Sequence, residues 1–117
     1  MARRALCALA LLAVSPLALA HAHLSSSSPA NGAVLDQAPT TLTATFTEGV
    51  ETALSSLTLT DDNGHTTSLD KLSASSDGDN TYQVALPRLK AGHYKIDLHI
   101  TSVDTHRMEE QLQFTVK

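Results

Sequence analysis

The strongest constraint on the fold is a strict alternation of apolar and polar residues late in the chain. Residues 94–100 read Tyr-Lys-Ile-Asp-Leu-His-Ile, which places Tyr94, Ile96, Leu98 and Ile100 on one side of an extended backbone. A helix would spread these residues around its whole surface. The pattern therefore predicts a β-strand with one buried face and one solvated face.

The same period of two recurs elsewhere and predicts an all-β domain. The apolar sets are Leu42, Ala44 and Phe46; Leu57 and Leu59; Tyr82, Val84 and Leu86; and Leu112, Phe114 and Val116. Turn residues separate them at 29–32, 62–64, 76–80 and 91–92, and the longer connection 48–54 has room for one helical turn. Short strands of this kind fit an immunoglobulin-like Greek-key β-sandwich, with a small barrel as the alternative.

The first twenty residues have the pattern of a secretory signal peptide. Two arginines precede an apolar run, residues 6–14, which is too short to span a bilayer, so a retained anchor is the weaker interpretation. Ala18 and Ala20 form a small-residue cleavage site that would make His21 the first residue of domain 21–117. A second such site would cut after Ala22 and leave His23 first. We expect the exported chain to be soluble.

Removal of the signal peptide changes the chemistry that the chain can offer. The one cysteine, Cys7, leaves with it, so disulfides and thiolate metal sites are excluded from the remainder. Six Lys and Arg then face twelve Asp and Glu. This acidic balance argues against binding to nucleic acid.

A terminal histidine is an unusual metal ligand because its free α-amine and its imidazole can chelate one ion. Further donors are available in Asp104-Thr105-His106, where residues two apart on an extended segment project to the same side. If the first and last strands lie together, His21, Asp104 and His106 can meet. Three nitrogens and a carboxylate suit Cu(II), although zinc can also use such donors.

With these motifs in place, the chain resembles the CopC-domain family of small periplasmic copper-binding proteins. The matching segments are His21-Ala22-His23-Leu24, Ser27 to Val34, Ala38-Pro39, Leu42 to Val50, Ala91 to Asp97, Ser102 to His106 and Phe114 to Val116. Their order and spacing together are more specific than any one of them.

The resemblance implies both a site and a role. It implies a Cu(II) site at His21, Asp104 and His106 in a periplasmic protein of copper homeostasis or resistance. It also implies a partner, an inner-membrane copper transporter of the CopD type. Affinity for Cu(II) is then expected to fall as the pH drops through the range in which histidine protonates.

The chain departs from the family pattern at several positions. The region 61–72 has no methionine cluster, so soft ligation of Cu(I) is not expected and the chain would be a Cu(II)-only member. Arg107-Met108-Glu109-Glu110 replaces the usual proline and glycine after His106, and Leu98 stands where a tryptophan is common. These changes concern the loop shape and the core packing more than the ligands.

His23 has three possible roles. It can orient a ligand, it can be solvated, or it can bind Cu(II) as the third residue of a free terminus through the amine, two deprotonated amides and its imidazole. We rank the folded site first, and keep His23 as the least certain of its metal residues. His65, His93 and His99 are expected to be solvated, as are the acidic pairs Asp61-Asp62 and Glu109-Glu110, which would keep strand edges from pairing.

Three classes of function follow. The first is a non-enzymatic Cu(II)-binding protein that sequesters or delivers copper. The second is a copper oxidase of the polysaccharide monooxygenase type, which also uses a terminal histidine; the short chain, the absence of tryptophan and the extra carboxylate argue against it. The third is a metal-free immunoglobulin-like interaction module.

Overall fold

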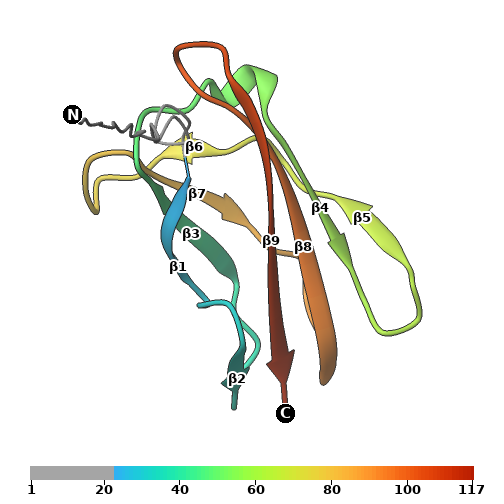
Figure 1. Cartoon of the computed structure of the whole chain (residues 1–117). Coiled ribbons are helices and arrows are strands. Elements are labelled where there is room, and N and C mark those ends of the chain that lie inside the picture. Colours follow the sequence, from blue (N-terminus) through green and yellow to red (C-terminus); the bar gives the residue numbers. More distant parts are fainter. Residues whose placement is uncertain (1–22) are drawn as a thin grey trace, which may run out of the picture.

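The structure, a computed structural model, describes residues 23–117 and shows two β-sheets packed face to face (Figure 1). The expected signal peptide and His21 lie outside the described residues. One sheet has the strand order β1 (Leu24–Ser28), β3 (Thr41–Phe46), β7 (Thr81–Ala85) and β6 (Ser73–Ala74). The other has the order β2 (Ala33–Leu35), β9 (Arg107–Val116), β8 (Gly92–Thr101), β4 (Ser56–Thr60) and β5 (Thr66–Ser68).

This arrangement confirms the prediction of an immunoglobulin-like sandwich. The chain crosses repeatedly from one sheet to the other, as between β3 and β4 and between β7 and β8. The strands of residues 23–117 form two separate hydrogen-bonded sheets, so the barrel alternative does not hold. The single helical turn expected in the connection 48–54 is the 3₁₀ helix η2 (Thr52–Leu54).

The alternating residues form the core, as their period predicts. Leu42, Leu57, Ile96, Leu98 and Leu112 are almost completely buried. Leu98 has no exposed surface. The rings of Tyr94 and Phe114 stack with centroids 5.5 Å apart, which adds a specific contact to the apolar burial.

The strands without clear alternation lie at the sheet edges. β1, β5 and β6 are short and mostly exposed, and β1 contains four serines. Edge strands of this kind bury little apolar surface, so their sequences carry little hydrophobic pattern. This explains why sequence reasoning did not identify them.

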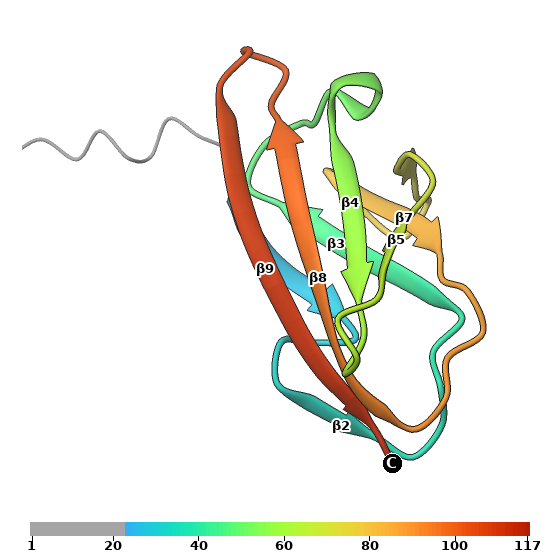
Figure 2. The same cartoon turned by 90° about the vertical axis from the view of Figure 1, so that its right-hand side faces the viewer.

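The start of the described chain runs alongside β9, in the same direction. β2 pairs with β9 in parallel, with Ala33 opposite Phe114 and Leu35 opposite Val116. β1 precedes β2 and lies nearer the beginning of β9, in the other sheet (Figures 1 and 2). Moving upstream along β1 therefore leads toward the loop between β8 and β9.

Candidate metal centre

The loop between β8 and β9 brings two of the expected ligands together. Its residues 102–106 form a turn that is closed by a hydrogen bond from the Ser102 amide to the His106 carbonyl, 2.9 Å. Within it, Asp104 Oδ1 and His106 Nδ1 lie 3.2 Å apart, and both side chains are about half exposed. The predicted proximity of Asp104 and His106 is thus observed.

Ser102 holds the carboxylate of Asp104. Ser102 is fully buried, and its hydroxyl donates a hydrogen bond to Asp104 Oδ1. That bond, followed by smaller contributions from His106, holds the pKa of Asp104 below its ordinary value, although partial desolvation acts in the opposite direction. Asp104 is accordingly a preformed anionic donor.

The loop is not extended as expected. Thr105 has a φ of 69°, in the left-handed region that β-branched residues rarely occupy, and its amide donates to the Ser102 carbonyl at 2.8 Å. A turn at Thr105, rather than the alternation of a strand, brings Asp104 and His106 to the same side. The expectation about the geometry was wrong, because the chain must reverse between β8 and β9 at this point.

The connection that follows β3 links this loop to the beginning of the described chain. The Thr47 amide donates to the His23 carbonyl at 2.8 Å, and the Val103 amide donates to the Gly49 carbonyl at 3.0 Å. Glu48 lies between these two attachment points and is half-buried. It is a further carboxylate at this end of the molecule, which the sequence analysis did not single out.

His23 contacts Thr47 and Glu110. Its amide donates to Thr47 Oγ1 at 2.8 Å, and its Nδ1 is 3.9 Å from Glu110 Oε2. Glu110 also accepts from the Leu24 amide at 3.4 Å. The expectation that Glu110 is solvated was therefore wrong. Its even spacing from Leu112 and Phe114 was the signal that it faces inward.

The described residues hold only part of the expected ligand set. Within residues 23–117 there is no cluster of three or more His, Cys, Asp or Glu side chains arranged to hold a metal. Asp104 and His106 are together, His23 is attached to Glu110, and His21 lies outside the described residues.

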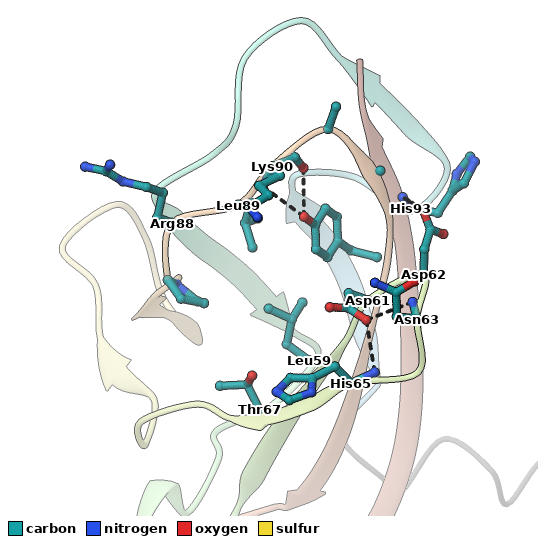
Figure 3. A pocket seen from close by; sticks show the side chains of 14 residues that line it. Leu59, Asp61, Asp62, Asn63, His65, Thr67, Arg88, Leu89, Lys90 and His93 are labelled. Atoms are coloured by element: carbon teal, nitrogen blue, oxygen red, sulfur yellow. Dashed lines mark hydrogen bonds between the residues drawn. The ribbon is translucent and has the colours of Figure 1, made fainter.

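The remaining histidines are exposed, as predicted. Two of them, His65 and His93, lie beside the pocket of Figure 3, at the turn between β4 and β5 and the start of β8, which is the end of the sandwich opposite the loop between β8 and β9 (Figure 1). Asp61 Oδ1 accepts from the amides of Asn63 and His65, and Asp62 Oδ2 accepts from the His93 amide, 2.9–3.0 Å in each case. These aspartates cap a turn and a strand, so they are more than solvated edge residues. His99 lies on the outer face of β8, 3.6 Å from Glu109.

The comparison with known families identifies the domain. Residues 24–117 match the family described as the CopC domain. The chain belongs to the CopC-domain family. This CopC-domain chain is also 36% identical over 116 residues to the proteins called YobA from Escherichia coli K12 and from Shigella flexneri, which covers 98% of this chain and 94% of theirs.

Solved structures agree with this membership. CopC from Methylosinus trichosporium OB3b matches with a TM-score of 0.75 and 26% identity, over 83% of this CopC-domain chain and 94% of that one. PcoC from Escherichia coli, described as a methionine-rich copper resistance protein, matches with a TM-score of 0.69 and 26% identity, over 83% and 99%. Across residues 23–117, none of the helices is long and apolar enough to cross a membrane.

Proposed function

We propose that this CopC-domain protein is a periplasmic copper-binding protein of copper homeostasis or resistance, with a Cu(II) site formed by His21, Asp104 and His106. The α-amine and imidazole of His21 would provide one chelate, and the loop between β8 and β9 would provide the other two donors. In this proposal residues 1–20 are the removed signal peptide and 21–117 the functional domain.

The observation that carries the proposal is the pairing of Asp104 and His106. Asp104 Oδ1 and His106 Nδ1 form a direct contact of 3.2 Å, so the two side chains are close enough to reach one metal ion. Because the donors are a nitrogen and a carboxylate oxygen, they match the preference of Cu(II).

The direction of β1 supports a contribution from His21. Leu24 is level with Glu110 on β9, and β9 begins directly after His106. Four residues of strand span about 13 Å, and three residues upstream of Leu24 reach at most about 10 Å. Since β1 and β9 run in the same direction (Figures 1 and 2), that reach is toward His106.

The contacts of His23 favour a supporting role over direct ligation. Binding at the free terminus alone would require the His23 amide nitrogen to lose its proton and bind the metal. That amide instead donates to Thr47 Oγ1 at 2.8 Å. The folded site therefore remains our first choice, with His23 as a residue that orients the chain near it.

Cu(II) is favoured over Cu(I) because soft donors are scarce. The chain has two methionines, Met1 and Met108, and the first lies in the proposed signal peptide. Met108 packs against the hydrophobic core rather than at a sulfur cluster. The relative PcoC, by contrast, is described as methionine-rich.

The proposed role is to bind copper and to sequester or deliver it, without catalysis. A copper oxidase needs an open coordination position, and Asp104 places a carboxylate beside His106. A membrane copper transporter of the CopD type is the partner that this proposal names for delivery.

The test begins with the first residue of the exported protein, which mass spectrometry of periplasmic extract determines. Cu(II) titration then compares the chain that starts at His21 with Asp104→Ala, His106→Ala and a chain that keeps Ala20. The last variant retains the His21 imidazole, but the backbone nitrogen of His21 becomes part of a peptide bond and is no longer a free amine. We expect each change to weaken binding by at least about tenfold, because even outer residues of metal sites cost 10–100-fold.

His65→Ala is the matched control, since it removes an exposed histidine in the turn between β4 and β5, at the opposite end of the sandwich (Figure 1). It should leave Cu(II) affinity unchanged. Wild-type affinity in both Asp104→Ala and His106→Ala would reject the folded site and point to binding by the free terminus alone, which His23→Ala would then abolish.

A further inference from the structure

Glu110 is an acidic side chain on the inner side of a core strand. The residues two, four and six positions later on β9, Leu112, Phe114 and Val116, are all buried. The side chain of Glu110 is 29% exposed, whereas that of its neighbour Glu109, on the outer face, is 79% exposed. A carboxylate placed inward in this way needs polar partners to offset its partial loss of solvent.

The partners of Glu110 belong to the other sheet. Its Oε2 accepts from the Leu24 amide at 3.4 Å and lies 3.9 Å from His23 Nδ1. β1 is the edge strand of the four-stranded sheet, whereas Glu110 belongs to the five-stranded sheet. The carboxylate therefore connects the two sheets at their open edge.

β1 is an element that needs such a connection. Its sequence is Leu-Ser-Ser-Ser-Ser, none of its residues is fully buried, and its pairing with β3 is irregular between Leu24 and Ser26. An edge strand presents backbone groups without a neighbouring strand on one side. Glu110 accepts from one such amide at the residue where β1 begins.

We infer that Glu110 is a positioning residue that clasps the first strand to β9 and thereby directs the chain start toward Asp104 and His106. This inference rests on the proposed copper site, because Glu110 would guide His21 toward the two donors that it is proposed to join. Glu110 and the loop that carries Asp104 and His106 belong to one continuous segment of chain. A contact from Glu110 to Leu24 therefore fixes the chain start relative to those two donors.

The effect of Glu110 should be local. Exposed or half-exposed ion pairs contribute little to global stability. The readouts must accordingly report on β1 and on the site, rather than on unfolding of the whole domain. Amide hydrogen exchange at Leu24 in the metal-free protein reports on β1, and the affinity and electron paramagnetic resonance spectrum of bound Cu(II) report on the site.

The experiment compares Glu110→Ala, Glu110→Gln and the matched control Glu109→Ala, all in the chain that starts at His21, with Cu(II) as the probe. Glu109→Ala removes the same charge one residue away but does not touch β1. For Glu110→Ala we expect Leu24 exchange to accelerate and Cu(II) affinity to fall, each by about fivefold, with an altered spectrum. Glu110→Gln keeps an oxygen acceptor, so it should restore most of the slow Leu24 exchange and most of the Cu(II) affinity. It also tests the inference if the alanine variant does not fold.

Two results would overturn the inference: unchanged Leu24 exchange in Glu110→Ala, or equal Cu(II) affinity in Glu110→Ala and Glu109→Ala while Asp104→Ala is weakened. Failure of the copper site itself is distinguishable. In that case Asp104→Ala binds Cu(II) as tightly as the wild type, and exchange at Leu24 still reports separately on the clasp.

Discussion

The chemistry of the candidate site depends on how individual side chains are held. Asp104 is at the surface, yet the buried hydroxyl of Ser102 donates to its carboxylate and lowers its pKa. A lowered pKa in the folded state means that the ionised carboxylate adds stability above the pKa of the unfolded chain. That contribution is lost as the pH falls through the lower folded value.

We predict that Asp104 titrates below the ordinary range for aspartate, and that Ser102→Ala raises its pKa toward the ordinary value. The cause is loss of the hydrogen bond that makes the largest contribution to the shift. Nuclear magnetic resonance titration of the metal-free protein measures both values. An unshifted Asp104 in the wild type would contradict the role of Ser102.

The lowered pKa of Asp104 also distinguishes this carboxylate from the other candidate donors in its response to acid. Asp104 stays ionised throughout the range in which histidine ordinarily protonates. Any loss of Cu(II) affinity in that range would therefore report on the imidazoles and the terminal amine.

At the scale of elements, β8 connects the core to the site. Four of its side chains, from Tyr94 to Ile100, pack inside the sandwich, and its last residue leads directly into Ser102 and the loop. Thr105 reverses the chain in the left-handed region, at an intrinsic cost of about 1–2 kcal/mol. The regular pairing of Thr101 with Arg107 encloses this turn.

We predict that Leu98→Ala destabilises the domain by about 2–5 kcal/mol, because it removes a fully buried side chain and leaves a cavity. His99→Ala is the matched control on the same strand, since His99 faces solvent beside Glu109. It should change the free energy of unfolding by less than about 1 kcal/mol. Urea denaturation measures both. Similar losses for the two variants would be inconsistent with the assigned core face.

At the scale of the whole molecule, the proposed site would bring together segments from both sheets. His23 precedes the edge strand of one sheet, and Asp104 and His106 join two central strands of the other. The connection after β3 bridges them through Thr47 and Gly49. A metal held by His21 and this loop would therefore link the sheets as well as bind to the surface.

We predict that Cu(II) raises the melting temperature of the chain that starts at His21. Free Cu(II) at one hundred times the dissociation constant adds about 2.7 kcal/mol, which corresponds to roughly 10–20 °C for a domain of this size. Differential scanning calorimetry measures the shift. Asp104→Ala should show a much smaller increase, and an equal increase in that variant would indicate binding elsewhere.

The sequence determined the core and pointed to the candidate donors. Alternation at Leu42 to Phe46 and Tyr94 to Ile100 identified the buried faces, since a period of two leaves few ways to hide apolar side chains. The motif Asp104-Thr105-His106 named two candidate donors, and their side chains lie 3.2 Å apart in the structure. His21 remains a prediction, because it lies outside the described residues.

Only the tertiary structure decided how these candidate donors are held. Glu110 contacts Leu24 and Thr47 contacts His23, and both partners are distant in sequence. Ser102 contacts Asp104 inside a turn. The hydrophobic periodicity of the sequence does not predict such pairs. The turn at Thr105 was likewise missed, because a left-handed residue is imposed by the reversal between two paired strands and not by its own preference. The local hydrophobic period determines which face of each strand is buried, whereas the packing of the two sheets determines which polar side chains contact each other.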